Sequence, residues 1–456
     1  MKQLLSKKNL LLLAGVIALF HSLLGTLYYL MDLTLLNRLD YVLGAVLAAA
    51  AVLHWYYYRP RLRANAEQVL LILLLLWYGL SCVVMTNTFQ GNWLKGNAQP
   101  LFDTAMLVLV VFALGRYVGR QGMPKLLVYL VHAILLAWTA FMIYVLAVML
   151  QNRIIELPNG GQIGFSRAMC LYLNCYYNTT GAIQIVAFLC CFCMAFWMRH
   201  PAMKAVYGLA SCVHYIILVF SNSRTALLAT MLGFAAIVGI AIFAIQKQGT
   251  PLRRILIAVA AGGAAGIVFY LLRDTVFNVY ESLTHHNALL GIETDGMRDM
   301  LGESAFNLNN RTVGWKYSLQ AMVYDTQKFF TGVTPISVIS MLDLASNGAW
   351  KMYTHNQFLE IGVALGVPGM CLFIAWFVLV LKDCWHLFFI KKDTRNALFV
   401  PMILMVLTVA NMAEATLMFY RFITSYAFFF FCGWVNGRVQ PAKASVTKAK
   451  KKKGKK

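Results

Sequence analysis

The sequence has few charged residues. Only 12% of its 456 residues are Asp, Glu, Lys or Arg, whereas 60% are hydrophobic, and the mean hydropathy is +0.67. An ordinary soluble domain carries about 25% charged residues. The composition therefore excludes a soluble globular protein of this length.

Signatures of metal and cofactor chemistry are missing as well. The chain has no HExxH motif and no cluster of side chains at metal-ligand spacing, so the sequence predicts neither a metal nor a cofactor. Two features leave alternatives open. Glu293 and Asp295 are either a divalent-cation site or a solvated turn, and Cys170 and Cys175 either pair or remain free.

Apolar runs long enough to cross a bilayer, about 20 residues each, recur along the chain. We count twelve, at residues 10–31, 40–58, 68–86, 100–119, 126–150, 181–198, 204–220, 225–245, 254–272, 357–381, 396–416 and 420–436. The first follows three lysines and is interpreted as a retained signal anchor. The predicted fold class is all-α: a polytopic membrane protein of about twelve transmembrane helices, with one large extracytoplasmic loop between spans nine and ten.

The basic residues are unevenly distributed among the segments that join the spans. If both termini lie inside, the cytoplasmic segments hold 27 of the 39 basic residues and 3 of the 17 acidic ones, a charge of +24, and the rest of the chain carries −2. Positive charge collects on the cytoplasmic side of membrane proteins. The sequence thus predicts cytoplasmic termini and an extracytoplasmic loop.

This orientation divides the chain into four parts. Residues 1–272 hold spans one to nine, 273–356 form the large extracytoplasmic loop with short helices, 357–436 hold spans ten to twelve, and 437–456 form a basic cytoplasmic tail. The tail has eight lysines after residue 442 and no acid. We interpret it as a solvated segment near anionic lipid, with no role in binding nucleic acid.

Polar residues gather where the large loop meets span ten. His355, Asn356 and Glu360 lie within six residues of each other, and helical spacing would place Asn356 and Glu360 on one face. Glycines at positions 362, 366 and 369 then form a stripe that lets another helix approach closely. Polar groups at the mouth of a membrane helix are costly to bury, so this mouth is predicted to be an active site.

A very short turn joins spans seven and eight, which are predicted to form a helical hairpin. Ser223 or Asn222 can cap the second helix, and Arg224 adds a positive charge at its N-terminus. Free N–H groups, the helix dipole and an arginine together favour an anion. The alternative is an arginine that anchors the helix end among lipid headgroups, and the sequence does not decide between the two.

Other polar residues lie in the predicted outer segments. Arg311 stands near a helix start, with Trp315 one turn later. Arg167 and Asn178 lie in the segment before span six, together with tyrosines, and are either part of a sugar site or polar caps beside an interfacial aromatic belt.

Two acidic residues lie near the predicted membrane surface. Asp103 is either a functional carboxylate or one that faces the headgroups. Glu414 is predicted to pair with Arg421 across a tight outer turn, in a purely structural role.

Three of these pieces occur together in a fixed order: Ser221-x-Ser223-Arg224, then Arg311-x-x-x-Trp315, then His355-Asn356-x-Phe358-Leu359-Glu360. In this order and topology the set resembles the O-antigen ligase and polymerase family of bacterial envelope enzymes. The resemblance is strongest over residues 165–370. The asparagines before span six lack the Asn-Pro-Asn pattern of that family.

The resemblance implies a glycosyltransferase of the bacterial cytoplasmic membrane. Such an enzyme moves a glycan from undecaprenyl diphosphate to an acceptor hydroxyl on a glycan, lipid-linked sugar, cell-wall polymer or protein. In this chain it implies His355 as general base, Arg224 and Arg311 on the diphosphate, and Arg167, Asn178, Ser223, Trp315, Asn356 and Glu360 as substrate-binding residues. The chemistry fits these residue types, because arginine stabilises a diphosphate leaving group and histidine accepts protons near neutral pH.

Two other classes of protein share this composition. A lipid-linked glycan flippase or other transporter would also be basic and polytopic, but broken helices or charges at mid-membrane, often with internal repeats, are expected of it, and the sequence shows none of these. A non-catalytic scaffold that binds lipid-linked glycans would keep its function without His355. The sequence does not distinguish a ligase from a polymerase, because the two differ only in the acceptor.

Overall fold

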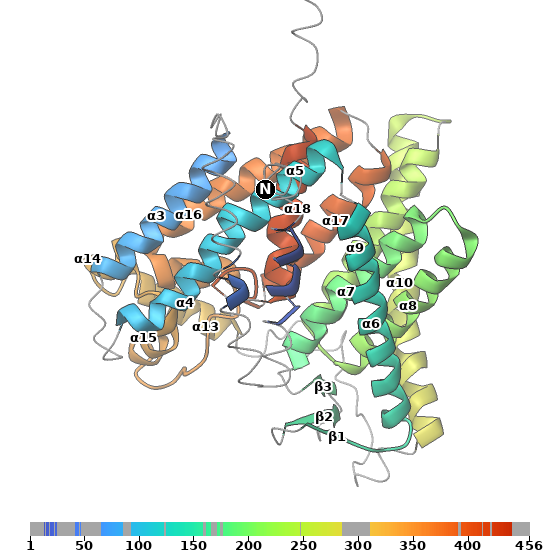
Figure 1. Ribbon diagram of the computed structural model, residues 1–456, viewed down its shortest axis with the longest axis horizontal. Coiled ribbons are helices and arrows are strands. Elements are labelled where there is room, and N and C mark those ends of the chain that lie inside the picture. Colours follow the sequence, from blue (N-terminus) through green and yellow to red (C-terminus); the bar gives the residue numbers. More distant parts are fainter. Residues whose placement is uncertain are drawn as a thin grey trace, which may run out of the picture.

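The protein is a bundle of long helices with small elements gathered at one end (Figure 1). The computed structural model describes residues 65–84, 93–122, 125–157, 161–165, 171–173, 177–246, 248–284, 311–390, 394–412, 414–419 and 422–439, together with scattered residues between 13 and 46. The first two predicted spans, the cytoplasmic tail and residues 285–310 fall largely or wholly outside these ranges.

Eight helices in the described part of the chain are long and apolar enough to cross a membrane. They are α3 (Ala66–Val84), α4 with η1 and α5 (Trp93–Ala105, Met106–Val111 and Phe112–Gln121), α6 (Lys125–Met149), α7 (Tyr177–Trp197), α8 (Pro201–Phe220), α9 (Arg224–Ile245), α10 (Pro251–Thr284) and α16 (Gln357–Trp385), which continues as η3 (His386–Ile390). They match predicted spans three to ten in order. The prediction of a helical, polytopic membrane protein is therefore confirmed.

The ends of several predicted spans differ from the observed helices. The last two predicted spans correspond to α17 (Thr394–Asn411) and α18 (Ile423–Val439), which are shorter than the eight helices above and are not among those long and apolar enough to cross a membrane. In contrast, α10 has 34 residues and continues past the predicted end at residue 272. At 1.5 Å per residue it is about 51 Å long, more than the roughly 30 Å hydrocarbon core, so its last turns project beyond the membrane.

The segment predicted as an irregular outer loop contains a small antiparallel sheet, so the fold is not purely helical. The strands are β1 (Ile155–Glu156), β2 (Gln162–Phe165) and β3 (Leu171–Leu173), in the order β1-β2-β3. Ile163 pairs with both Ile155 and Leu173, and the two leucines of β3 are fully buried. Alternate apolar residues thus cover one face of the sheet. This alternation is hard to detect in the sequence, because the strands are only two to four residues long.

Short helices after residue 310 lie at the same end of the bundle as this sheet (Figure 1). They are α13 (Arg311–Met322), α14 (Thr326–Thr331), η2 (Pro335–Ser337) and α15 (Val338–Ala345). We call this end of the molecule the loop end. The side-chain amide of Asn152, after α6, donates to the carbonyl of Thr284 at 2.8 Å, so the C-terminal end of α10 lies there too.

The tight turn between α8 and α9 is present, but the two helices do not pack along their length. Residues 221–223 separate the helices. Beyond the turn α8 packs mainly on α7, and α9 packs on α10 and α17. The expected hairpin is therefore a turn between diverging helices. The turn itself contacts other segments of the loop end.

Helices α5 and α18 cross at glycines on both partners. A Cβ atom at Gly433 would overlap the carbonyl of Phe112, and one at Gly115 would overlap the carbonyl of Phe430. The same holds one turn further along, for Gly119 and Gly437. These two pairs of small residues at four-residue spacing bring the backbones into direct contact, which is a strong device for helix association in lipid.

We expect Gly433→Ala to destabilise the protein by about 1–3 kcal/mol, because the added methyl group has no space and the helices must separate. The matched control is Gly263→Ala on α10, where nothing lies within 4 Å of the new methyl group. That control should be neutral or slightly stabilising, since alanine favours a helix. The melting temperatures of Gly433→Ala and Gly263→Ala are measured by thermal unfolding in detergent. Equal melting temperatures for the two variants would contradict the close crossing of α5 and α18.

Helix α16 is broken close to its start, at Gly366, whose φ is 71°. The carbonyls of Val363 and Ala364 accept hydrogen bonds from the backbone N–H groups of Val333 and Thr334, at 3.0 and 2.8 Å. The indole of Trp77 donates to Leu365 O at 2.9 Å. Gly366 thus interrupts the helix rather than extending a glycine stripe, and the segment after α14 satisfies the backbone groups that the break releases. The expectation that no helix is broken was wrong.

Candidate active site

Three segments that are far apart in the sequence meet at the loop end. Arg311, at the first position of α13, donates through Nη1 to the hydroxyl of Thr225 on α9 at 3.2 Å. Its Nη2 lies 2.7 Å from Oε1 of Glu414, between α17 and α18. The other oxygen of Glu414 lies 3.5 Å from Nδ1 of His355. One carboxylate therefore connects the N-terminus of α9, the arginine of α13 and the histidine before α16.

The N-terminus of α9 is capped as predicted. Ser223 is the N-cap residue, and its hydroxyl accepts a hydrogen bond from the N–H of Ala226 at 3.4 Å. Asn222 has a positive φ of 49° and is buried, and its side-chain amide has no hydrogen-bond partner among the described residues. Gly181 of α7 packs directly against Ser223 and Ala226. Arg224 follows, half-buried, so a cation stands beside the positive end of a helix dipole.

His355 adopts a left-handed backbone conformation, with φ of 53°, and precedes the first residue of α16. His355 therefore lies outside the helix, before the N-cap residue Asn356. Its ring lies against the ring of Tyr353, with centroids 4.2 Å apart, and edge-on to Trp350. The residue is only 8% exposed, and Nδ1 makes no hydrogen bond that meets geometric criteria. Strained conformations of this kind are concentrated at functional sites.

Glu414 is the site residue that the sequence analysis missed. It was expected to pair with Arg421, which lies outside the described residues. Glu414 is 5% exposed, and it accepts from Nη2 of Arg311 and, at 3.0 Å, from the hydroxyl of Tyr353. A buried carboxylate needs such partners to remain charged. No local pattern marks this role, because Arg311 and Tyr353 lie 103 and 61 residues away in the sequence.

Amide side chains hold the segment that carries Glu414. The carbonyl of the Asn411 side chain accepts from the backbone and hydroxyl groups of Thr416, at 2.7 and 3.0 Å. Oε1 of Gln357, the first residue of α16, accepts from the backbone N–H groups of Leu417 and Met418. These bonds fix the segment between α17 and α18 to the start of α16, beside His355.

Two of the predicted substrate-binding residues have structural partners. Oδ1 of Asn356 caps α16 by accepting from the N–H groups of Phe358 and Leu359, and its Nδ2 donates to Met412 O at 3.0 Å. Glu360 is buried and accepts from both the N–H and the hydroxyl of Thr354, at 3.2 and 2.8 Å. Together they fix the turn that presents His355.

The structure places some of the other candidates and does not describe the rest. Trp315 is half-buried one turn after Arg311, and its indole N–H has no hydrogen-bond partner among the described residues. Asp103 is 4% exposed on α4, so it faces protein instead of headgroups. Other residues lie outside the described part of the chain, namely Arg167, the side chain of Asn178, Cys170, Cys175, Glu293 and Asp295.

Chemically, the cluster combines Arg311, His355 and the carboxylate of Glu414, and it lies beside the N-terminus of α9, where Arg224 is the first residue. Within the described residues, no three histidine, cysteine, aspartate or glutamate side chains gather closely enough to hold a metal ion. The arginines and the helix N-terminus can bind an anion, and the histidine can accept a proton from a nearby hydroxyl.

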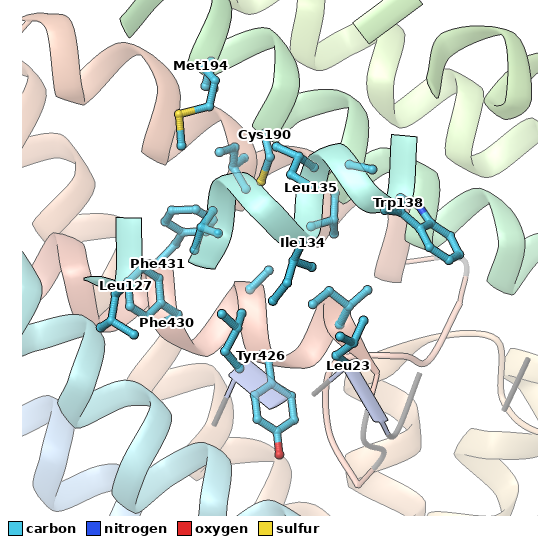
Figure 2. A pocket seen from close by; sticks show the side chains of 18 of the residues that line it. Leu23, Leu127, Ile134, Leu135, Trp138, Cys190, Met194, Tyr426, Phe430 and Phe431 are labelled. Carbon is cyan, nitrogen blue, oxygen red and sulfur yellow. The ribbon is translucent and has the colours of Figure 1, made fainter. Parts of the chain in front are cut away.

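A separate cavity of about 300 Å³ lies inside the bundle and is almost entirely apolar (Figure 2). Its walls include Ile134 and Trp138 of α6, Cys190 of α7, and Tyr426 and Phe430 of α18. The hydroxyl of Tyr426 points out of the cavity and makes a hydrogen bond with Nδ1 of His21. These walls suit hydrocarbon and offer nothing to a sugar or a phosphate, so we place no reaction there.

Comparison with known families agrees with the motifs at the loop end. Residues 209–374 match the model of the O-antigen ligase family. This range includes Arg224, Arg311 and His355, together with the break in α16. No curated protein matches the chain. The resemblance seen in the sequence is therefore confirmed over residues 209–374 of this multi-pass bacterial membrane protein, which match the O-antigen ligase family.

Proposed function

We propose that this protein transfers a glycan from undecaprenyl diphosphate to an acceptor hydroxyl at the outer face of the cytoplasmic membrane. The match of residues 209–374 to the O-antigen ligase family supports, at a general level, an enzyme that uses a lipid-linked glycan donor and a glycan acceptor. The observation that carries the finer proposal is the cluster itself, in which Arg311 joins the N-terminus of α9 to the histidine before α16.

The proposed reaction is a direct displacement. The acceptor O–H loses its proton to His355, and the oxygen attacks the anomeric carbon of the donor glycan. The bond between this carbon and the diphosphate oxygen breaks, and its electron pair leaves with the diphosphate. Attack from the opposite side inverts the anomeric centre.

The arginines act on the leaving group in this scheme. Negative charge grows on the diphosphate as the bond breaks, and Arg224 and Arg311 stand where such charge would meet the dipole of α9. Groups that are already oriented stabilise the developing charge without rearrangement during the reaction. The proposal needs no nucleotide, because the lipid diphosphate is already an activated leaving group.

A transporter is the second candidate, and one observation bears on it. Helix α16 is broken at Gly366, and discontinuous helices occur in many transporters. However, the break lies near the start of the helix, and Val333 and Thr334 bind the carbonyls it releases. With the indole of Trp77 on Leu365 O, three carbonyls at the break are bonded within the protein, so the break shapes the loop end.

The test of the function is a reconstituted transfer reaction. The purified protein is incubated with a defined undecaprenyl-diphosphate oligosaccharide and with candidate acceptors, and products are followed by mass spectrometry. The proposal expects an acceptor carrying the donor glycan, with release of undecaprenyl diphosphate. Movement of the intact donor across liposomes, with no change in its covalent structure, would favour the transporter.

Orientation is tested separately, by labelling engineered cysteines in cells. Lys351 is exposed at the loop end, and Gln121 is exposed at the other end of the bundle. The charge distribution predicts that Lys351→Cys reacts with a membrane-impermeant maleimide in spheroplasts, whereas Gln121→Cys reacts only after permeabilisation. The parent protein measures the background from its own cysteines. The reverse pattern would show that the loop end is cytoplasmic and would remove the proposed site from the outer face.

A further inference from the structure

Glu414 occupies the centre of the cluster, and both of its oxygens are engaged. Oε1 accepts from Arg311 at 2.7 Å, while Oε2 accepts from Tyr353 at 3.0 Å and lies 3.5 Å from Nδ1 of His355. The side chain of Glu414 is 6% exposed, that of His355 is 10% and that of Arg311 is 13%. Water therefore has little access to this carboxylate, so the direct contacts of the three side chains determine how they are oriented.

The imidazole of His355 is held by two aromatic rings and one carboxylate. Tyr353 and Trp350 contact its ring, and Glu414 is the carboxylate next to Nδ1. Glu360 also acts on the histidine electrostatically, but its Oε2 accepts two hydrogen bonds from Thr354. Closing the 3.5 Å gap to a hydrogen bond needs a shift of only about 0.5 Å to reach the usual N–H···O distance.

We propose that Glu414 is a positioning residue of the transfer reaction: it binds the Nδ1 proton of His355, which leaves Nε2 as the nitrogen that accepts the proton of the acceptor hydroxyl. The same carboxylate pairs with Arg311, but a second nitrogen of that arginine donates to Thr225 and keeps the guanidinium at the N-terminus of α9 without Glu414. This inference rests on the proposed function, and nothing in the sequence pattern around residue 414 indicates it.

The proton balance of the step follows from this arrangement. The acceptor O–H proton moves to Nε2, and His355 becomes an imidazolium with protons on both nitrogens. Glu414 remains ionised and stabilises that cation across Nδ1, while the electron pair of the broken C–O bond leaves with the diphosphate. A carboxylate that orients a catalytic histidine acts in the same way in hydrolytic triads, where it fixes the tautomer and does not itself take the proton.

The test uses Glu414→Gln, which preserves shape but removes the charge. We expect kcat for glycan transfer to fall about 10- to 100-fold, the cost typical of losing a group that orients a catalytic side chain. The Kd for undecaprenyl-diphosphate oligosaccharide should stay within about threefold of wild type, because Arg224 and Arg311 remain. Glu414→Asp keeps the charge and should recover part of the lost kcat.

The matched control is Asp383→Asn. Asp383 is also a buried carboxylate with an amide partner, since Asn436 donates to it at 2.8 Å, but it lies at the opposite end of α16 from His355. Its replacement makes the same chemical change without touching the cluster. It should leave kcat of the folded protein unchanged.

A double-mutant cycle separates positioning from simple stabilisation. If Glu414 acts through His355, adding Glu414→Gln to His355→Ala should lower kcat by less than twofold further. A full 10- to 100-fold additional loss in that background, or loss of donor binding in Glu414→Gln, would overturn the inference. Normal turnover by Glu414→Gln together with inactivity of His355→Ala would overturn the positioning role of Glu414 but would not contradict the proposed function.

Discussion

Replacement of His355 by alanine should abolish glycan transfer while the protein still folds and still binds the donor. A positioned general base contributes on the order of 10²–10⁴-fold to the rate, so the loss should appear in kcat and not in donor affinity. Donor binding depends on the arginines and on lipid contacts, which the histidine does not supply. The measurements are initial rates of transfer and donor binding, made in parallel on the purified variant.

The structure explains why folding should survive this change. His355 precedes α16 and donates no hydrogen bond to the cap, since Asn356 performs the capping. Alanine also removes a bulky side chain from a strained left-handed position, without opening a cavity in the membrane core. Near-normal transfer by a well-folded His355→Ala protein would exclude the histidine from the mechanism.

A second buried histidine provides a contrast. His214 on α8 makes hydrogen bonds to Gln184 of α7 and Thr139 of α6, at 2.8 and 3.0 Å, and all three side chains are buried among the helices. His214→Ala should cost about 1–3 kcal/mol of stability, because it leaves these partners unsatisfied. The molecules that fold should keep normal kcat. Replacement of His214 should thus change stability, whereas replacement of His355 should change turnover.

Replacement of either arginine of the clamp by lysine should weaken donor binding and turnover together. Arg311 uses two different nitrogens, one on Thr225 and one on Glu414, and lysine offers a single point charge where this planar fork is needed. For Arg224→Lys and Arg311→Lys we expect turnover to fall about 10²–10³-fold, as when an oxyanion-stabilising donor is removed. Donor titration and initial rates are the measurements.

Arg254→Lys is the control for this prediction. Arg254 lies near the start of α10, donates to Phe243 O at 2.9 Å and stacks on the ring of Phe243, at the end of the bundle away from His355. It should transfer glycan at the wild-type rate. Wild-type donor binding by both Arg224→Lys and Arg311→Lys would show that these arginines anchor helix ends and do not bind a diphosphate.

Local sequence patterns were sufficient for the features that depend on neighbouring residues. Long apolar runs predicted spans three to ten, because lipid requires about 20 residues of continuous helix. The N-cap at Ser223 and the helix start at Arg311 were read from short motifs, because capping is a contact between residues two or three apart. The family resemblance followed from the same motifs and their order.

Only the tertiary structure determined how these features combine. Glu414 joins Arg311 and Tyr353 across 103 and 61 residues of sequence, distances at which no periodicity gives a signal. Gly366 could be read as one more small residue of a stripe, and it breaks α16 because Val333 and Thr334 are present to satisfy the released carbonyls. The sequence by itself determined that this is a helical membrane protein with a polar mouth. Long-range hydrogen bonds between the loop segments decided which side chains meet there and how the histidine is held.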